Sequence, residues 1–245
     1  MNNAEYQNMF EQERDHFFYR FTHDAVLQIA STLHLTRPVK ILDVGCGTGM
    51  LVKKLQRIGI AEGVDAHPNA VRFGKKRNIR IRRGLIGSLP FRTRSFHLVT
   101  CIDVLCHRSI QNDVTALKEL KRVLLPGGIL ILRVPAHQYL YGAHDHYVHT
   151  KYRYSKNKLL HLLKRSGFSV PYITYMNAGL FIPSVLKKIS ELVLQPREAS
   201  TVTPLPKWLN NVLYSMLKLE IPLLKKRVEI PFGIEVIAVC RNPNH

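Results

Sequence analysis

Short apolar runs alternate with amphipathic stretches along most of the chain. The apolar runs predict buried strands at 39–45, 61–65, 79–82, 96–102, 129–134 and 234–241. Between them, apolar positions recur at helical spacing and predict helices at 50–59, 68–77, 112–124 and 156–168. Strands that alternate with helices in this way predict a parallel, doubly wound sheet with helices on both faces.

Two regions lie outside this alternation. Residues 4–35 carry apolar and aromatic side chains at helical spacing and predict two helices before the sheet. Residues 177–232 separate the last two strands by far more than a hairpin would. We therefore predict a single α/β domain over 1–245 with a Rossmann-like, mostly parallel seven-stranded sheet. Residues 1–37 are expected to form an N-terminal helical cap and 177–232 a helical insertion, or lid, before the last strand.

A glycine-rich loop follows the first predicted strand. The stretch "LDVGCGTGM" spaces its glycines as GxGxG, and Met50 occupies the position of the third glycine in a dinucleotide-binding loop. No GK[ST] motif for a triphosphate is present. Asp65 ends the second predicted strand about twenty residues later, where a carboxylate can accept hydrogen bonds from both ribose hydroxyls. The loop and Asp65 together predict a nucleoside-containing cofactor at the carboxyl ends of the strands.

These segments resemble the class I S-adenosylmethionine-dependent methyltransferases over nearly the whole chain. "ILDVGCGTG" is similar to their first motif, and "EGVDAHP" to the segment that carries their ribose-binding acid. "SLPFRTRSFHLVTCIDVLCH" and "LKRVLLPGGILIL" resemble the segments around their fourth and fifth strands. The resemblance implies a methyltransferase that binds S-adenosyl-L-methionine.

The resemblance also implies which residues hold that cofactor. Asp43 would support the glycine loop, Asp65 would bind the ribose, and Ile102 and Asp103 would lie beside the methionine end. Leu85 stands where many relatives have an aspartate for the adenine amino group, so Ile86 and backbone groups would hold adenine. The implied cofactor-binding residues are Asp43, Gly45, Cys46, Gly47, Thr48, Gly49, Asp65, Ala66, Ile86, Ile102 and Asp103.

A narrower resemblance concerns two further segments. "EQERDHFFYR" is similar to an E-x-x-H-W-W-F-R element, and "VPAHQYLYGAHDHYVHTKYRYS" to a P-A-x-x-x-L-W-S-x-H-D-x-x-x-x-H-x-R-R-Y pattern. Both are typical of a bacterial branch of these enzymes that is associated with glycan or lipid-linked substrates. The resemblance implies a small-molecule, glycan or lipid-linked methyl acceptor.

The histidine-rich stretch "AHDHYVHTKYRYS" follows the fifth predicted strand on the cofactor rim. An oxygen acceptor gains from a base that removes its proton, and histidine suits this task near neutral pH. Candidate catalytic residues are therefore Asp145 and His149, with His107 as the rival base. In the alternative interpretation Asp145 pairs with Arg153 or His149 and merely packs the loop. No metal-ligand spacing is present, and we expect no metal.

Composition adds information about partners and location. The formal net charge of +19 favours an anionic partner such as nucleic acid, a membrane surface or a phosphorylated substrate. Four scattered cysteines form no CxxC pair, the first residues lack a signal-peptide core, and no apolar run reaches about 18 residues. These features predict a cytoplasmic protein. Trp208 and the lysines of the insertion suit peripheral contact with an anionic membrane.

The sequence therefore predicts methyl transfer from S-adenosylmethionine, with oxygen favoured as the accepting atom. An RNA methyltransferase is one alternative, although the chain lacks the N/D-P-P-Y/F and Pro-Cys motifs of base methylators. A non-catalytic adaptor with a cofactor fold at a membrane surface is the other. The pattern does not predict the oligomeric state.

Overall fold

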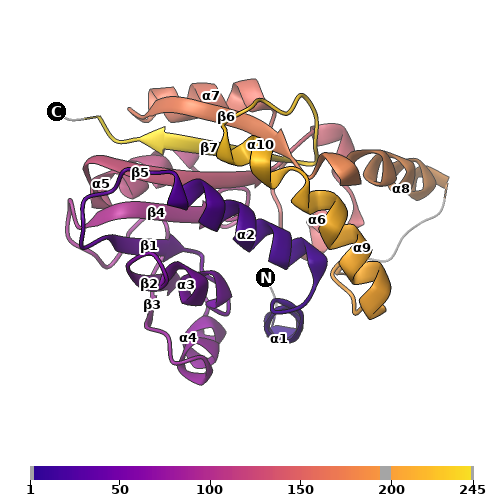
Figure 1. The fold of residues 1–245 in the computed structure, drawn as a ribbon, viewed down its shortest axis with the longest axis horizontal. Helices are drawn as coiled ribbons and strands as arrows, with labels where there is room; N and C mark the ends of the chain where they lie inside the picture. The colour runs from indigo at the N-terminus through magenta and orange to yellow at the C-terminus, as the bar shows by residue number, and fades with distance from the viewer. Residues whose placement is uncertain (1–2, 194–199, 244–245) are drawn as a thin grey trace.

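The computed structural model describes residues 3–193 and 200–243. Seven strands form one sheet in the order β3-β2-β1-β4-β5-β7-β6 (Figure 1). All neighbours pair in parallel except β7, which runs antiparallel to both β5 and β6. The predicted mostly parallel, seven-stranded α/β fold is confirmed. The strands are β1 (Lys40–Val44), β2 (Ile60–Asp65), β3 (Ile81–Arg83), β4 (Phe96–Ile102), β5 (Leu124–Pro135), β6 (Ser169–Met176) and β7 (Glu235–Arg241).

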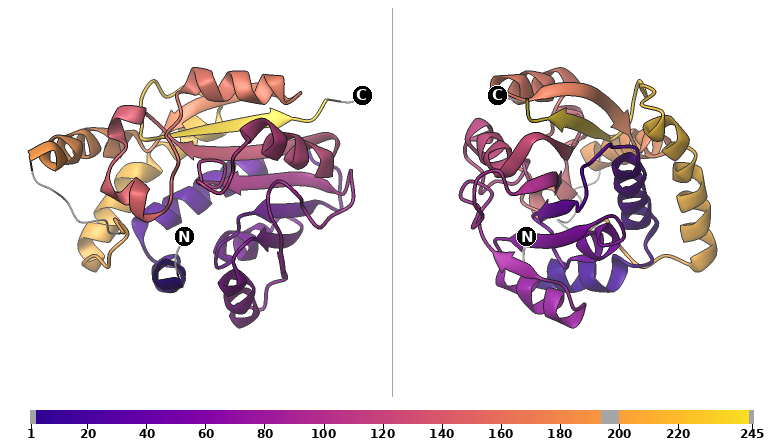
Figure 2. Two further views of the ribbon diagram at one scale, coloured as in Figure 1. Left: turned by 180° about the vertical axis from the view of Figure 1, so that it is seen from behind. Right: turned by 60° about the vertical axis from the view of Figure 1, so that its left-hand side comes forward.

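Helices cover both faces of the sheet because the central strands are apolar on both sides (Figures 1 and 2). One apolar core contains residues of α2 and α3, and the other contains residues of α5 and α7. The helices up to the sixth strand are α1 (Asn3–Gln12), α2 (Phe17–Ser31), α3 (Met50–Leu55), α4 (Pro68–Lys76), α5 (Asp113–Val123), α6 (Ala143–Tyr147) and α7 (Lys156–Arg165).

Several predicted boundaries are refined by the structure. The two N-terminal helices form as predicted, and the hydroxyl of Ser155 caps α7 by accepting from the Lys158 amide at 3.2 Å. The helix predicted over 50–59 ends at Leu55. The Pro-Gly-Gly stretch lies inside β5, because this strand already begins at Leu124, directly after α5. The pairing of β5 with β4 shifts register at this point.

The insertion after β6 is helical, as predicted. It contains α8 (Phe181–Val193), α9 (Lys207–Lys218) and α10 (Ile221–Lys225). Helices α9 and α10 both contact α2, and the buried Glu220 accepts hydrogen bonds from the amides of Asn177 and Ala178, each at 2.8 Å. These contacts anchor the insertion to the end of β6. No helix among the described residues is long and apolar enough to cross a membrane.

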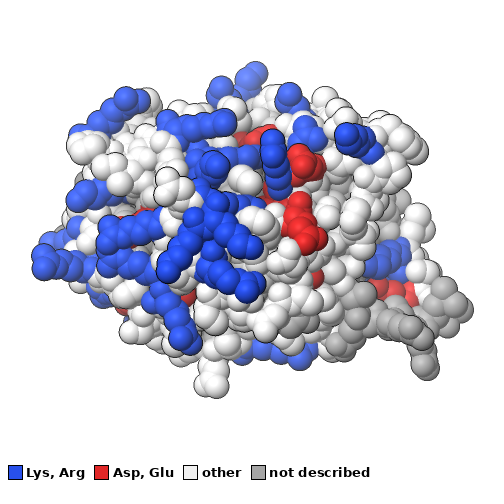
Figure 3. Space-filling view, turned by 90° about the horizontal axis from the view of Figure 1, so that it is seen from below, with Lys and Arg blue, Asp and Glu red and all other residues white. Residues whose placement is uncertain are grey.

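Lysine and arginine side chains gather on one broad face of the molecule (Figure 3). On α4 and β3 they are largely exposed, as expected for charges at the edge of a sheet. The basic run between Arg72 and Arg94 falls within this part of the fold.

Candidate active site

The glycine loop turns sharply between β1 and α3. Gly45, Gly47 and Gly49 all have positive φ, at +71°, +53° and +86°. A Cβ at Gly45 would collide with Val104, and one at Gly47 would lie 2.7 Å from the Met9 sulfur. The predicted glycines are therefore required by both the backbone conformation and the close approach of neighbouring side chains.

A cavity of about 850 Å³ opens beside this loop, at the carboxyl ends of the parallel strands. Most of the predicted cofactor-binding residues line it. They are Asp43, Gly45, Cys46, Gly47, Asp65, Ala66, Ile86, Ile102 and Asp103. Leu85 also lines the cavity, and its side chain is largely exposed.

Thr48 and Gly49 do not line this cavity. The Thr48 hydroxyl donates a hydrogen bond to the buried Glu13, and Gly49 is the N-cap of α3. Their place in the loop is therefore structural: Thr48 ties the loop to the N-terminal segment, and Gly49 lets the helix begin.

Asp65 lies at the end of β2 with both carboxylate oxygens directed at donors. Its Oδ1 accepts from the Tyr6 hydroxyl at 2.7 Å and from the His67 amide at 2.9 Å. Its Oδ2 accepts from the Gly47 amide at 2.9 Å. Asp65 thus links the glycine loop to α1, and a ribose would have to compete with Tyr6 for it.

Asp43 supports the base of the site on β1. It is buried, and the Thr100 hydroxyl donates to its Oδ1 at 2.6 Å. Burial raises the Asp43 pKa to about 7, although the hydrogen bond from Thr100 opposes this rise. The carboxyl therefore lies at the cavity wall in an apolar environment.

Glu13 is a buried carboxylate that sequence reasoning did not assign to the site. It pairs with Arg77 at 2.7 Å, accepts from Thr48, and lies 3.7 Å from the His23 imidazole. Burial raises the Glu13 pKa, and the charge of Arg77 opposes the rise. The only sequence signal was the E-x-x-H element, and it did not indicate that Glu13 would reach the glycine loop.

The histidine-rich stretch forms α6 and the turn after it. Asp145 is buried, accepts two hydrogen bonds from Arg153 Nε at 3.1 and 3.0 Å, and caps α6 through the Gly142 amide at 3.0 Å. Tyr154 is fully buried, and its hydroxyl donates to Asp113 at 2.9 Å. These contacts agree with the packing interpretation of this stretch, in which Asp145 pairs with Arg153.

The candidate bases occupy different places around the cavity. His107 and Asp145 line it, whereas His149 does not. The rings of His107 and His149 meet edge to face with centroids 5.9 Å apart. Burial lowers the His107 pKa to about 4, so this imidazole is neutral near pH 7 and is a weak base. His107 and Asp145 therefore border the cavity, whereas His149 contacts His107 without lining it.

The predicted lid contributes little to the cavity. Of the described residues in 177–232, only Val202 lines it. Tyr6, Met9 and Glu13 from the N-terminal segment and Phe18 and Tyr19 from α2 cover it instead. Helices α9 and α10 pack against α2, residues 194–199 lie outside the described part of the chain, and the helical lid over 177–232 stays a prediction.

A second polar cluster lies where β4 and β5 end and the antiparallel β7 begins. Arg133 is buried, and its guanidinium donates to both oxygens of Asp103 and to the Thr22 hydroxyl at 2.5 Å. Glu235 Oε2 lies 3.8 Å from Arg133 Nε. All three charged residues line the cavity. Only Asp103 was expected there, because Arg133 and Glu235 lie in apolar runs that read as plain buried strands.

A methyltransferase domain model matches residues 42–132, which include β1, β2 and β4 with the cofactor end of the cavity. An S-adenosylmethionine-dependent methyltransferase of Thermotoga maritima has the same fold, with a TM-score of 0.60 and 20% identity over 98% of this chain and 95% of that chain. Residues 42–132 thus match a methyltransferase domain within a fold that this solved methyltransferase shares.

Two relatives of this protein are demethylmenaquinone methyltransferases. The protein of Staphylococcus aureus (strain MRSA252) is 33% identical over 113 residues, which are 42% of this chain and 46% of that protein. The protein of Tropheryma whipplei (strain Twist) is 29% identical over 183 residues, 70% of this chain and 75% of that protein. The chain thus spans about half the length of the first relative and three quarters of the second.

Residues 3–193 and 200–243 contain no group of three histidine, cysteine, aspartate or glutamate side chains that could hold an ion. His144 Nδ1 accepts from the Thr201 amide at 3.2 Å, and the His146 ring contacts Arg108 at 2.9 Å. These two histidines take part in contacts within the fold.

Proposed function

We propose that this protein transfers a methyl group from S-adenosylmethionine to a small-molecule acceptor. One observation carries the proposal: a single cavity joins the glycine loop and Asp65 to a second end lined by His107, Asp145 and Arg133. A cofactor and an acceptor can therefore meet in one cavity, as a direct transfer requires. The names of the two relatives also favour a small molecule.

The residues at the cofactor end fit S-adenosylmethionine. Gly47 leaves space that a side chain would fill, and Asp65 offers a carboxylate at hydrogen-bonding distance from the loop. Bound there, S-adenosylmethionine would supply an electrophilic methyl group. When the bond between this methyl carbon and sulfur breaks, its electron pair would stay on sulfur. Ile86 and Ile102 would exclude water from that group's surroundings, and Asp103 would face it from the end of β4.

A direct experiment separates this function from its alternatives. Isothermal titration with S-adenosylmethionine distinguishes an enzyme from a cofactor-fold adaptor, which would not bind it. Transfer of a radiolabelled methyl group into fractionated cell extract then assigns the acceptor to small molecules, lipid, glycan, RNA or protein. Label in the small-molecule fraction supports the proposal, and label confined to RNA contradicts it.

We also propose peripheral contact with an anionic membrane through α9 and α10, on the inner face of a cell membrane. Apolar side chains on these helices are exposed in one stripe at helical spacing: Trp208, Val212, Met216, Leu219 and Leu223. The charged residues exposed between 207 and 227 are all basic, because the lone acid, Glu220, is buried. They are Lys207, Lys218, Lys225, Lys226 and Arg227.

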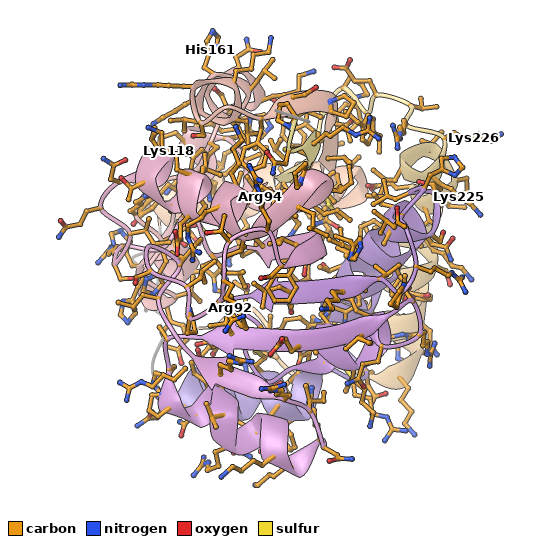
Figure 4. All side chains as sticks on the ribbon, turned by 90° about the vertical axis from the view of Figure 1, so that its left-hand side faces the viewer. Arg92, Arg94, Lys118, His161, Lys225 and Lys226 are labelled. Carbon is orange, nitrogen blue, oxygen red and sulfur yellow. The ribbon has the colours of Figure 1, made fainter. Side chains whose placement is uncertain are left out.

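This combination suits a lipid interface better than a second copy of the chain. Two basic surfaces repel each other, whereas anionic headgroups attract them. Lys225 and Lys226 point outward from the end of α10, clear of the sheet (Figure 4). Trp208 is 69% exposed at the start of the stripe and is a residue type favoured at the headgroup level.

A further inference from the structure

The cavity has the opposite charge character from the protein that contains it. The chain has 36 lysines and arginines against 17 acidic residues, and basic side chains dominate one face (Figure 3). Within the described residues, however, the cavity is lined by seven acids and only two arginines. The acids are Glu5, Glu13, Asp43, Asp65, Asp103, Asp145 and Glu235, and the arginines are Arg133 and Arg153. An anionic acceptor would therefore be repelled, which opposes the expectation drawn from net charge.

Six of the seven acids have hydrogen-bond partners within the fold. Glu5 bonds Ser200, Glu13 bonds Thr48 and Arg77, and Asp43 bonds Thr100. The remaining three are held in the same way. Asp65 bonds Tyr6, Asp103 bonds Arg133, and Asp145 bonds Arg153.

Glu235 differs from the other six. Its Oε2 is buried and makes no hydrogen bond with any part of the chain that the structure describes. The nearest cation, Arg133, is 3.8 Å away and directs its Nε and one terminal nitrogen at Asp103. A buried carboxyl without a hydrogen bond is costly, so the group is satisfied only when a ligand or water supplies the missing partner.

The charges around Glu235 come from all the elements that pack on it. Asp103 of β4 and Asp145 of α6 repel its negative form, while Arg133 of β5 and Arg153 attract it. Each arginine already pairs with one of those aspartates. When it is ionised, Glu235 is therefore a third negative charge beside two arginines that are each already paired with an aspartate. Burial, followed by repulsion from Asp103, raises its pKa to about 8.

We propose that Glu235 is the acceptor-binding group of this site and that the acceptor is an amine. The proposal rests on the methyl-transfer function above and names its substrate class. An ammonium group supplies both the hydrogen-bond donor and the positive charge that the Arg133–Asp103–Glu235 cluster lacks. The rings of Phe18 and Tyr19 line the same cavity, and Phe18 already lies 5.1 Å from the Arg133 guanidinium, in the geometry that also favours an organic cation.

The proton transfer that this arrangement allows is simple. The ammonium N–H bond breaks, its proton moves to a carboxylate oxygen of Glu235, and the electron pair stays on nitrogen as the nucleophile. A carboxyl with a pKa near 8 accepts a proton from an ammonium far more readily than an ordinary glutamate does. His107, whose pKa burial lowers to about 4, is much poorer at this task.

The first test sorts the labelled product by charge. Radiolabelled S-adenosylmethionine is incubated with the protein and a small-molecule cell extract, and the product is divided between a cation exchanger, an anion exchanger and an organic solvent. Because S-adenosylmethionine is itself a cation, the label found in an incubation without protein is subtracted from each fraction. Additional label on the cation exchanger is expected. Additional label only in the solvent or anion-exchange fraction would show a neutral or acidic product and overturn the amine. Absence of label from every fraction would contradict methyl transfer itself.

The second test examines Glu235 without any natural acceptor. Carbon NMR of the protein labelled at glutamate carboxyls should show one group titrating near pH 8 that is missing in Glu235→Gln. Ethylammonium chloride, used as a cationic probe, should lower this midpoint, whereas sodium chloride at equal ionic strength should not. A midpoint in the ordinary range, or one that ethylammonium leaves unmoved, overturns the proposal.

The Glu235→Gln variant links both tests. It keeps the size of the side chain but cannot take up a proton, so the methyl-transfer rate should fall about 100-fold and lose its rise toward alkaline pH. S-adenosylhomocysteine binding should be unchanged, which separates the effect from misfolding. Glu229→Gln is the matched control, because Glu229 is exposed and pairs with Lys156 on the surface. Equal rates in the two variants would contradict a role for Glu235.

Discussion

The hydroxyl of Tyr6 donates a 2.7 Å hydrogen bond to Oδ1 of Asp65, and so joins the first helix to the carboxylate that should bind the ribose. The Tyr6 ring also stacks on His67, with centroids 4.4 Å apart. Because Oδ1 already accepts from the His67 amide, its second lone pair cannot serve Tyr6 and a ribose hydroxyl together. Helix α1 therefore has to give up this contact when Asp65 binds both ribose hydroxyls.

We predict that Tyr6→Phe tightens cofactor binding. The variant keeps the ring and its stacking but removes the competing donor, which is worth about 1 kcal/mol or roughly fivefold in Kd. Titration calorimetry with S-adenosylhomocysteine measures the change. Weaker binding in the variant would instead make Tyr6 a direct cofactor contact.

Asp65→Ala should weaken cofactor binding by about 2–3 kcal/mol, because it removes two charge-assisted hydrogen bonds to the ribose. Glu62→Gln on the same strand is the matched control, since Glu62 faces Arg80 and Arg82 at the sheet edge. Undiminished binding in Asp65→Ala would refute the assignment of this carboxylate.

Asp145 and His107 should respond differently to substitution. Asp145→Asn breaks the buried pair with Arg153 and should lower the free energy of unfolding by about 2–3 kcal/mol. His107→Ala should leave stability nearly unchanged and reduce the transfer rate, because its ring lines the cavity. Urea unfolding and single-turnover rates on both variants make the comparison. A stable Asp145→Asn with low activity would restore Asp145 as a catalytic candidate.

Membrane contact should depend on the basic end of α10. Replacing Lys225 and Lys226 by glutamine should weaken flotation with phosphatidylglycerol vesicles by about 2 kcal/mol, roughly thirtyfold at low salt. Trp208→Ser should weaken it independently through the apolar stripe. Lys118→Gln on α5 is the control, because it removes a positive charge from the opposite face of the sheet. If the wild-type protein stays with the soluble fraction, the membrane proposal fails.

Stability should fall as pH rises through the titration of Glu235. Its folded-state pKa of about 8 lies above the ordinary value of 4.5, so the protonated form contributes stability that is fully present below the ordinary pKa. This contribution to the free energy of unfolding is lost as the pH rises from about 4.5 to about 8. Between about pH 5 and about pH 9, the wild type should therefore lose more stability than Glu235→Gln, as urea unfolding at both values will measure. Parallel losses in the two proteins would contradict the raised pKa.

The sequence by itself determined the fold class and the cofactor end of the site. Apolar runs such as 39–45 are long enough to predict buried strands, and GxGxG with Asp65 lies within one strand-helix-strand segment. These signals are local, so they can be read without knowing how the chain packs. A methyltransferase domain model matches the same segment.

Only the tertiary structure decided what occupies the acceptor end. Arg133, Asp103 and Glu235 are far apart in the chain and meet because the carboxyl ends of β4 and β5 lie beside the start of the antiparallel β7. Asp145 and His149 are only four residues apart, yet Asp145, within α6, lines the cavity, and His149, in the turn after α6, does not. The charge that lines the acceptor end of the cavity depends on which acidic and basic side chains pair with each other. Only the packing of the folded chain decides these pairs.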